Sequence, residues 1–87
     1  WLTSHVREML TFDGFKSARI HRQLDVSGKQ VDLCVHYVLE ELQYFQRYEV
    51  EHAARMRAQG LEAFPVGLSA TRAMWQICAE LRAESLR

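Results

Sequence analysis

Residues 31–39 read VDLCVHYVL, and this stretch decides the fold class of the chain. Its odd-numbered positions are large and apolar, whereas three of the four even-numbered positions are polar or small. Because side chains alternate between the two faces of a strand, a period of two predicts a β-strand with one face toward a core. The apolar set is Val31, Leu33, Val35, Tyr37 and Leu39, opposed by Asp32, Cys34, His36 and Val38.

The residues before this strand predict its partner. Residues 15–24, FKSARIHRQL, alternate more weakly, with polar side chains on both sides of the pattern. Residues 25–29 contain Ser27-Gly28 and have the composition of a hairpin loop. The sequence therefore predicts an antiparallel hairpin with one face available for a core.

Two helices are expected to flank the hairpin. Leu2, Val6, Met9 and Leu10 share one helical face, with His5 beside it, and Asp13-Gly14 ends that helix. Residues 40–59 predict one long helix, with Gly60 just after its last residue, and Phe64-Pro65 and Gly67 then break the chain. Its expected inner face holds Leu42, Phe45, Glu49, His52, Ala53 and Met56, with Tyr48 at the edge.

The residues after Ser69 fit two structures. Their composition of Ala, Arg, Met, Gln, Glu and Leu favours a helix. Thr71, Ala73, Trp75 and Ile77 nevertheless alternate with their neighbours as the residues of a strand do. Periodicity alone does not decide between helix and strand in a stretch this short.

Length and charge limit the function classes. The 87 residues make one small domain, 1–87, and eleven basic side chains balance eleven acidic ones. The chain lacks the cationic excess of a non-specific nucleic-acid binder and the apolar run of a membrane span, so we expect neither partner. Cys34 and Cys78 are too few for a disulfide framework. They could form a single bridge, but we favour two buried thiols in a reducing, cytoplasmic setting.

Several strings resemble a bacterial family, the domain of unknown function family 4286. They are WLTSHVREMLTFDGFKSARIHR at 1–22, LCVHYVLE at 33–40, RYEVEHAARMRAQGLEAFP at 47–65 and SATRAMW at 69–75. The resemblance covers nearly the whole chain. Its most specific pieces are Gly14-Phe15 with Ser17-Ala18-Arg19, and His52-Ala53 followed by Arg55-Met56-Arg57.

The resemblance implies a ferredoxin-like α+β fold of the dimeric α/β barrel superfamily. Two helices would cover one face of an antiparallel sheet, and the other face would pack on the sheet of a second copy. The resemblance implies a last strand over residues 70–77, and we expect a short helical or frayed tail at 79–87 after it. It also implies a first strand ahead of the first helix, which this sequence lacks, so that either upstream residues or a partner would supply it.

The family resemblance implies no established activity. Superfamily relatives include cofactor-free monooxygenases of polyketide quinones, haem-degrading enzymes and ligand-sensing modules, and fold alone does not select among them. No nucleophile motif, phosphate loop or dinucleotide fingerprint is present, so we expect no cofactor. Whether the chain is an enzyme stays open.

The weak catalytic candidates are His52, Glu49, His5 and Arg19. Glu49 and His52 are spaced i, i+3, which suits a carboxylate that orients a general base. The alternative, which we favour, is that Glu49 pairs with an arginine and His52 satisfies a backbone carbonyl. In a monooxygenase, His5, His52 and Arg19 would line a pocket between sheet and helices.

Three further sets have ordinary interpretations that we prefer. Four histidines, His5, His21, His36 and His52, lie on different elements without metal-ligand spacing, so no metal site is expected. Five arginines could clamp an anion, but surface salt bridges are favoured. Aromatic side chains could line a pocket, but core or dimer interface is favoured. These sets are Arg19, Arg22, Arg55, Arg57 and Arg72, and Tyr37, Tyr44, Phe45, Tyr48 and Trp75.

The sequence thus predicts a small cytoplasmic α+β domain that forms a homodimer through its sheet and shows no demonstrable chemistry. The alternatives are a cofactor-free monooxygenase or related small-molecule enzyme, and a regulatory module that binds a small-molecule ligand.

Overall fold

The computed structural model describes residues 1–66 and 69–86 and has an α+β fold. Helix α1 (Leu2–Met9) precedes strands β1 (Phe15–Leu24) and β2 (Gln30–Leu39). Helices α2 (Leu42–Glu51) and α3 (Ala53–Ala63) follow, and a short 3₁₀ helix, η1 (Ala83–Leu86), lies near the C-terminus. The two strands form one antiparallel sheet, and the described residues contain no third strand. The α+β class is therefore confirmed.

The predicted hairpin is confirmed in its position and in its loop. Strand β1 pairs with β2 so that Ala18 lies opposite Tyr37 and Arg19 opposite His36. In the loop, the Asp25 carboxylate accepts hydrogen bonds from the backbone N–H groups of Ser27 (2.9 Å) and Lys29 (3.0 Å). Gly28 has a φ of +87°, a conformation that glycine adopts without strain.

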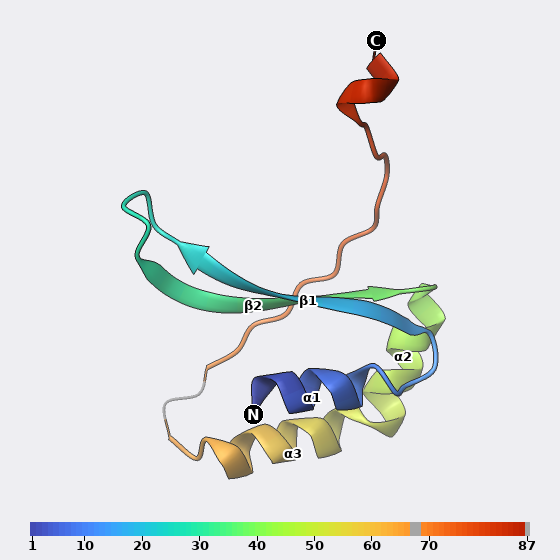
Figure 1. The fold of residues 1–87 in the computed structure, drawn as a ribbon. Helices are drawn as coiled ribbons and strands as arrows, with labels where there is room; N and C mark the ends of the chain where they lie inside the picture. Colours follow the sequence, from blue (N-terminus) through green and yellow to red (C-terminus); the bar gives the residue numbers. More distant parts are fainter. Residues whose placement is uncertain (67–68, 87) are drawn as a thin grey trace.

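The hairpin has an inner face toward the helices and an outer face away from them (Figure 1). Tyr37 packs against the helical core, and its partner Ala18 shares that inner face. Because side chains alternate along each strand, the intervening residues lie on the outer face. This outer face carries Ser17, Arg19, His21 and Gln23 from β1, and Asp32, Cys34, His36 and Val38 from β2.

The core lies between the inner face and the helices. Met9, Tyr48, Ala53 and Met56 are buried at its centre. Tyr48 is only 3% exposed, whereas Leu42 is 56% exposed and Glu49 is also exposed, so the predicted inner face of the long helix is partly wrong. Four partly buried aromatics surround this centre: Phe12, Phe15, Tyr37 and Phe45.

The prediction of a single helix over residues 40–59 is wrong, because the helical conformation is interrupted at His52. His52 has φ −130° and ψ −25°, which separates α2 from α3. Its imidazole stacks on the Phe12 ring, with ring centroids 4.0 Å apart and planes within 3° of parallel. The break changes the helical phase, which explains why Tyr48 and not Glu49 faces the core.

The end of this helical region also differs from the prediction. Gly60 lies inside α3 and is buried, and the helix continues to Ala63. Phe64 then leaves the helical conformation, with φ −133° and ψ 75°. The residue before a proline disfavours the helical region, so Pro65 rather than Gly60 fixes the end of the helix. The Gly67 part of the predicted break lies outside the described residues.

Residues 69–82 form neither the strand predicted at 70–77 nor a helix. Figure 1 shows this segment as an extended path that crosses the level of the sheet and continues beyond it. A strand exists only when its backbone pairs with a neighbour, and no described backbone bond joins residues 69–82 to the hairpin. Of the helical or frayed tail predicted at 79–87, residues 79–82 are not helical, η1 forms a 3₁₀ helix at Ala83–Leu86, and residue 87 lies outside the described residues.

Candidate functional site

The polar side chains between the layers gather around Arg72. Its Nη1 lies 2.9 Å from Oε1 of Glu49 on α2, and its guanidinium lies over the Tyr48 ring, 5.9 Å from the centroid. Glu49 also accepts a hydrogen bond from Arg57 at 3.2 Å. Arg72 therefore attaches the extended segment 69–82 to the face of α2.

Two titratable groups respond to this cation. Burial lowers the pKa of His5, against the opposing effect of Glu8, and the charge of Arg72 lowers it further. Burial also raises the pKa of Tyr37, Tyr48 raises it further, and Arg72 opposes both. The neutral forms of an imidazole and a phenol are therefore favoured near one cation.

His5 is the least satisfied polar group of this cluster. Its ring stacks on Trp1 with centroids 4.8 Å apart. Its Nδ1 is buried and, among the described residues, has no hydrogen-bond partner. An unpaired buried nitrogen costs free energy unless another molecule satisfies it, so this atom marks a place where a small polar ligand could bind.

The side chains of His52 and Glu49 bond to different partners and not to each other. Nδ1 of His52 is 3.3 Å from Nη2 of Arg55, and Nε2 is 3.7 Å from a carboxylate oxygen of Glu51. Glu49 instead pairs with two arginines, as the favoured interpretation expected. The expected backbone partner for His52 is replaced by the stack on Phe12.

A shallow cleft adjoins His52. It has a volume of about 190 Å³ and is lined by residues of the α1–β1 turn and of α2, among them Phe12, Asp13, Tyr44 and Arg47. Arg47 and Asp13 form an exposed ion pair at 3.4 Å across it. The lining thus has paired charges rather than a free acid or base.

Arg19 does not join the other candidates. It lies on the outer face of the sheet, opposite His36, whereas His5 and His52 lie in the helical layer. The pocket expected from His5, His52 and Arg19 is therefore not formed within this chain.

The remaining arginines confirm the salt-bridge interpretation where they are paired. Arg55 binds Glu8 at 2.9 Å, and Arg57 and Arg72 share Glu49. All these side chains are at least one-third exposed, so each pair contributes between zero and about 1 kcal/mol. The described arginines do not form one anion clamp.

The aromatic set is mostly core, as favoured. Tyr37, Phe45 and Tyr48 belong to the core cluster, whereas Trp75 is 88% exposed. Both cysteines are free and exposed, so the expectation of buried thiols is wrong. In the described part of the chain, no helix has the length and apolar character needed to cross a membrane.

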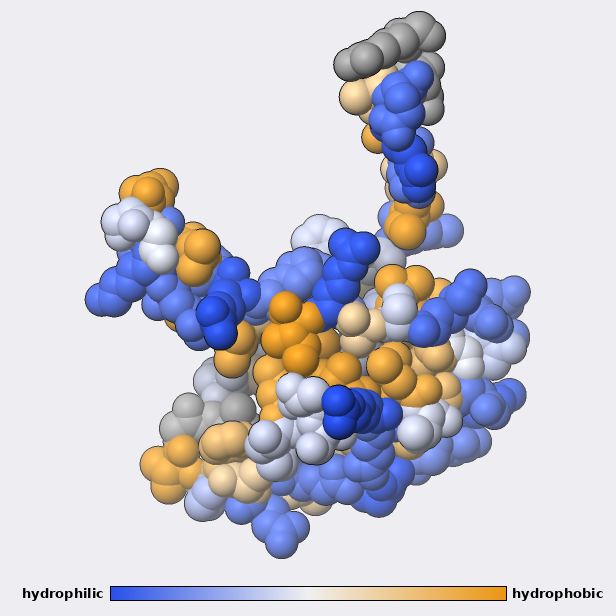
Figure 2. Space-filling view, viewed as in Figure 1, coloured by the Kyte–Doolittle hydropathy of each residue, from blue (hydrophilic) through white to orange (hydrophobic). Residues whose placement is uncertain are grey.

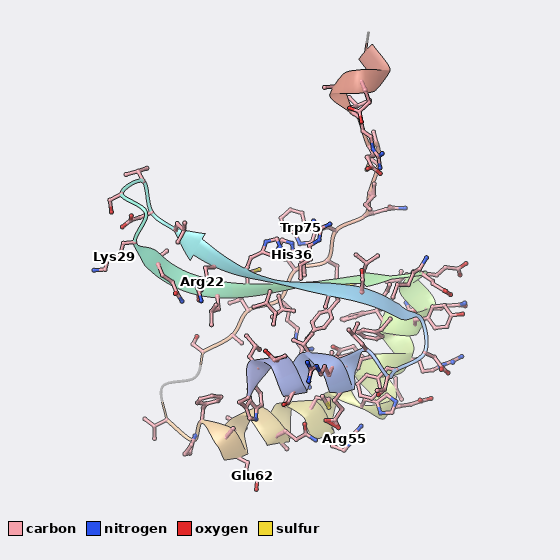
Figure 3. The ribbon with its side chains drawn as sticks, in the orientation of Figure 1. Arg22, Lys29, His36, Arg55, Glu62 and Trp75 are labelled. Carbon is pink, nitrogen blue, oxygen red and sulfur yellow. The ribbon has the colours of Figure 1, made fainter. Side chains whose placement is uncertain are left out.

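The hairpin brings together two histidines that sequence spacing left apart. His21 and His36 lie on the outer face with ring centroids 4.6 Å apart. Figure 3 shows His36 and Trp75 on the side of the sheet away from the helices. The strand register brings this pair together. The loop at 25–29 places His21 opposite Cys34, and His36 lies on the same face two residues after Cys34.

Comparison with known families gives one match, over residues 1–77, to the domain of unknown function DUF4286. The chain belongs to this family. No curated protein and no solved structure matches the chain. The family's description names no chemistry, in agreement with the sequence. The match extends to Ile77, so the unpaired segment 69–77 is part of the DUF4286 domain.

Proposed function

We propose that this DUF4286 domain is an assembly module that forms a homodimer through the outer face of its sheet. One observation carries the proposal. The chain exposes 7665 Å², whereas a compact monomer of 10.2 kDa exposes about 5,300 Å². The excess of about 2,300 Å² exceeds the roughly 800 Å² that each partner buries in a standard interface.

The dimensions of the chain support the same conclusion. Its Cα radius of gyration is 15.7 Å, compared with about 12 Å for a compact domain of this length. The overhanging hairpin and the segment 69–82 account for this extension (Figure 1). Elements of this kind gain stability when a second chain covers them.

Exposed apolar side chains lie on both faces of the hairpin, with Ile20, Leu24 and Leu33 on the inner face and Val38 on the outer face. On the inner face, Tyr37 packs against the chain's own helical core, and Val35 is half-buried. The outer face remains uncovered, with Val38 47% exposed and Trp75 88% exposed beside it. Figure 2 shows further hydrophobic side chains on the visible surface of the body and hairpin.

The proposal includes a ferredoxin-like arrangement in which two copies form a dimeric α/β barrel. It also includes a cytoplasmic setting, which is supported by two exposed free thiols, since such groups persist in reducing compartments. In this arrangement the partner covers the side of the sheet that the helices leave open.

Light scattering tests the dimer. We expect a mass about twice 10.2 kDa at micromolar concentration. Trp75→Ser combined with Val38→Lys should shift the protein to the monomer, because the pair removes apolar area and adds a charge at the contact. Val50→Ser is the matched control, since Val50 is 87% exposed but lies on α2. A monomeric wild-type protein would refute the proposal.

Binding of a small polar ligand is the second candidate function, favoured by the unpaired Nδ1 of His5 near Arg72. Titration with a panel of small carboxylic acids, followed by the imidazole signals of all four histidines, tests it. A ligand at this place should shift the His5 signals and leave those of His21 unchanged. Equal shifts at both, or none at His5, would exclude this candidate.

A further inference from the structure

We propose that His21 and His36 form half of a zinc site that a second copy of the chain completes. The inference rests on the proposed dimer, because the outer face must meet its own copy. Within the described residues, no group of three or more His, Cys, Asp or Glu side chains is placed to hold a metal ion. One chain therefore supplies two ligands, and a tetrahedral site needs four.

The geometry of the pair fits one metal. Two imidazoles that bind the same tetrahedral Zn²⁺, with Zn–N bonds of about 2.0–2.1 Å, have ring centroids about 5 Å apart. The His21 and His36 centroids are 4.6 Å apart, with ring planes inclined by 43°. Both residues are exposed, so their ring nitrogens are available to an ion from solution.

The surroundings of the pair favour a cation with nitrogen and sulfur ligands. Cys34 lies directly opposite His21 on the same face, and Asp32 lies two residues before Cys34 on β2. Arg19 lies opposite His36, and its positive charge would repel a bound cation, but its long side chain can turn toward solvent. Zinc binds imidazole and thiolate ligands, whereas hard cations such as magnesium prefer oxygen ligands.

The position of the pair suits a two-fold axis. His21 is the seventh residue of the ten in β1, and His36 is the seventh of the ten in β2. The pair therefore lies within the paired body of the hairpin and not at its loop. In a face-to-face dimer the axis can pass beside this diagonal pair, so that four imidazoles meet around one ion.

The consequence is an association that depends on metal availability. Zinc that binds only the dimer stabilises it by mass action, and the metal-free chain associates through apolar contacts alone. We expect zinc to lower the dimer dissociation constant by about tenfold or more.

Isothermal titration of the untagged, metal-free protein with zinc chloride tests the site. We expect 0.5 zinc per chain, and we expect binding to be lost in His21→Ala and in His36→Ala. His52→Ala is the matched control, because His52 lies in the helical layer and should leave binding unchanged. A ratio of one zinc per chain, or binding that survives both outer-face substitutions, would overturn the proposal.

Light scattering of the same samples separates this proposal from the dimer itself. If zinc does not bind but the metal-free protein is a dimer, the zinc site is refuted and the proposed function stands. If the protein is monomeric with and without zinc, both are refuted. Zinc binding that persists only while Cys34 is intact, and not in Cys34→Ser, would identify a different ligand set and refute the four-histidine site.

Discussion

Replacing Gly14 by alanine should destabilise the fold through one identifiable contact. Gly14 has a φ of +79°, in the turn between α1 and β1, and its carbonyl accepts a hydrogen bond from the N–H of Glu40 at 2.9 Å. A Cβ atom added here would overlap the Cβ and ring atoms of Tyr44. The substitution therefore forces both an unfavourable backbone conformation and a displacement of an aromatic side chain.

Gly28 provides the matched control. Its φ is +87°, almost the same as that of Gly14, but an added Cβ meets no atom within 4 Å. Gly28→Ala should cost about 1–2 kcal/mol, the penalty of a left-handed conformation for a residue with a Cβ. Gly14→Ala should cost that amount and about 1–3 kcal/mol more for overpacking, or about 2–5 kcal/mol in total.

Urea denaturation at one fixed chain concentration measures both values. The difference between the two variants isolates the Tyr44 contact, because the effect on the unfolded chain is the same for both substitutions. Tyr44→Ala in the Gly14→Ala background should recover only the part of that difference that comes from the ring atoms, because alanine keeps the Cβ atom of residue 44. Equal destabilisation by the two glycine substitutions would show that the approach of Tyr44 to Gly14 does not constrain the turn.

Two further predictions follow from the polar contacts. Because burial lowers the pKa of His5 in the fold, the unfolded chain binds this proton more readily, and the free energy of unfolding should fall as the pH drops below about 6.5. His5→Phe should flatten this dependence between pH 7.5 and 5.5, a window above that of the carboxylates, and an unchanged slope in urea denaturation would contradict it. Arg72→Ala should release the segment 69–82 from Glu49 and raise its rate of cleavage by chymotrypsin up to about fivefold, since an exposed pair contributes at most about 1 kcal/mol. Arg57→Ala, which breaks only the other ion pair of Glu49, should leave that rate unchanged, and equal rates in both variants would exclude Arg72 as the anchor.

Elements with a local signal were predictable from the sequence. The alternation of residues 31–39 and the Ser27-Gly28 loop gave the hairpin its correct strands. The break at His52 was not predictable, because no glycine or proline marks it and the stack that accompanies it is with Phe12, forty residues away. The end of α3 was predictable from Pro65, but Gly60 offered a competing signal that tertiary packing overrode.

The candidate sites also divide into contacts that follow from a local sequence signal and contacts between distant residues that do not. The less favoured interpretation, in which Glu49 orients His52, depended on a continuous helix, which the break at His52 interrupts. The contact between Arg72 and Glu49 joins residues 23 positions apart, for which periodicity has no signal. The His21–His36 pair, in contrast, follows from the hairpin register, and could have been derived once the loop at 25–29 was placed.

The orientation of the segment 69–82 connects its sequence pattern to the proposed dimer. Arg72 lies on the helical side, where it binds Glu49, whereas Trp75 lies on the outer side near His36 (Figure 3). The segment itself crosses the level of the sheet (Figure 1), so it carries side chains to both sides although no strand pairing forms. Trp75 is 88% exposed there. A second copy that covers the outer face would bury Trp75 and leave the Arg72–Glu49 contact intact.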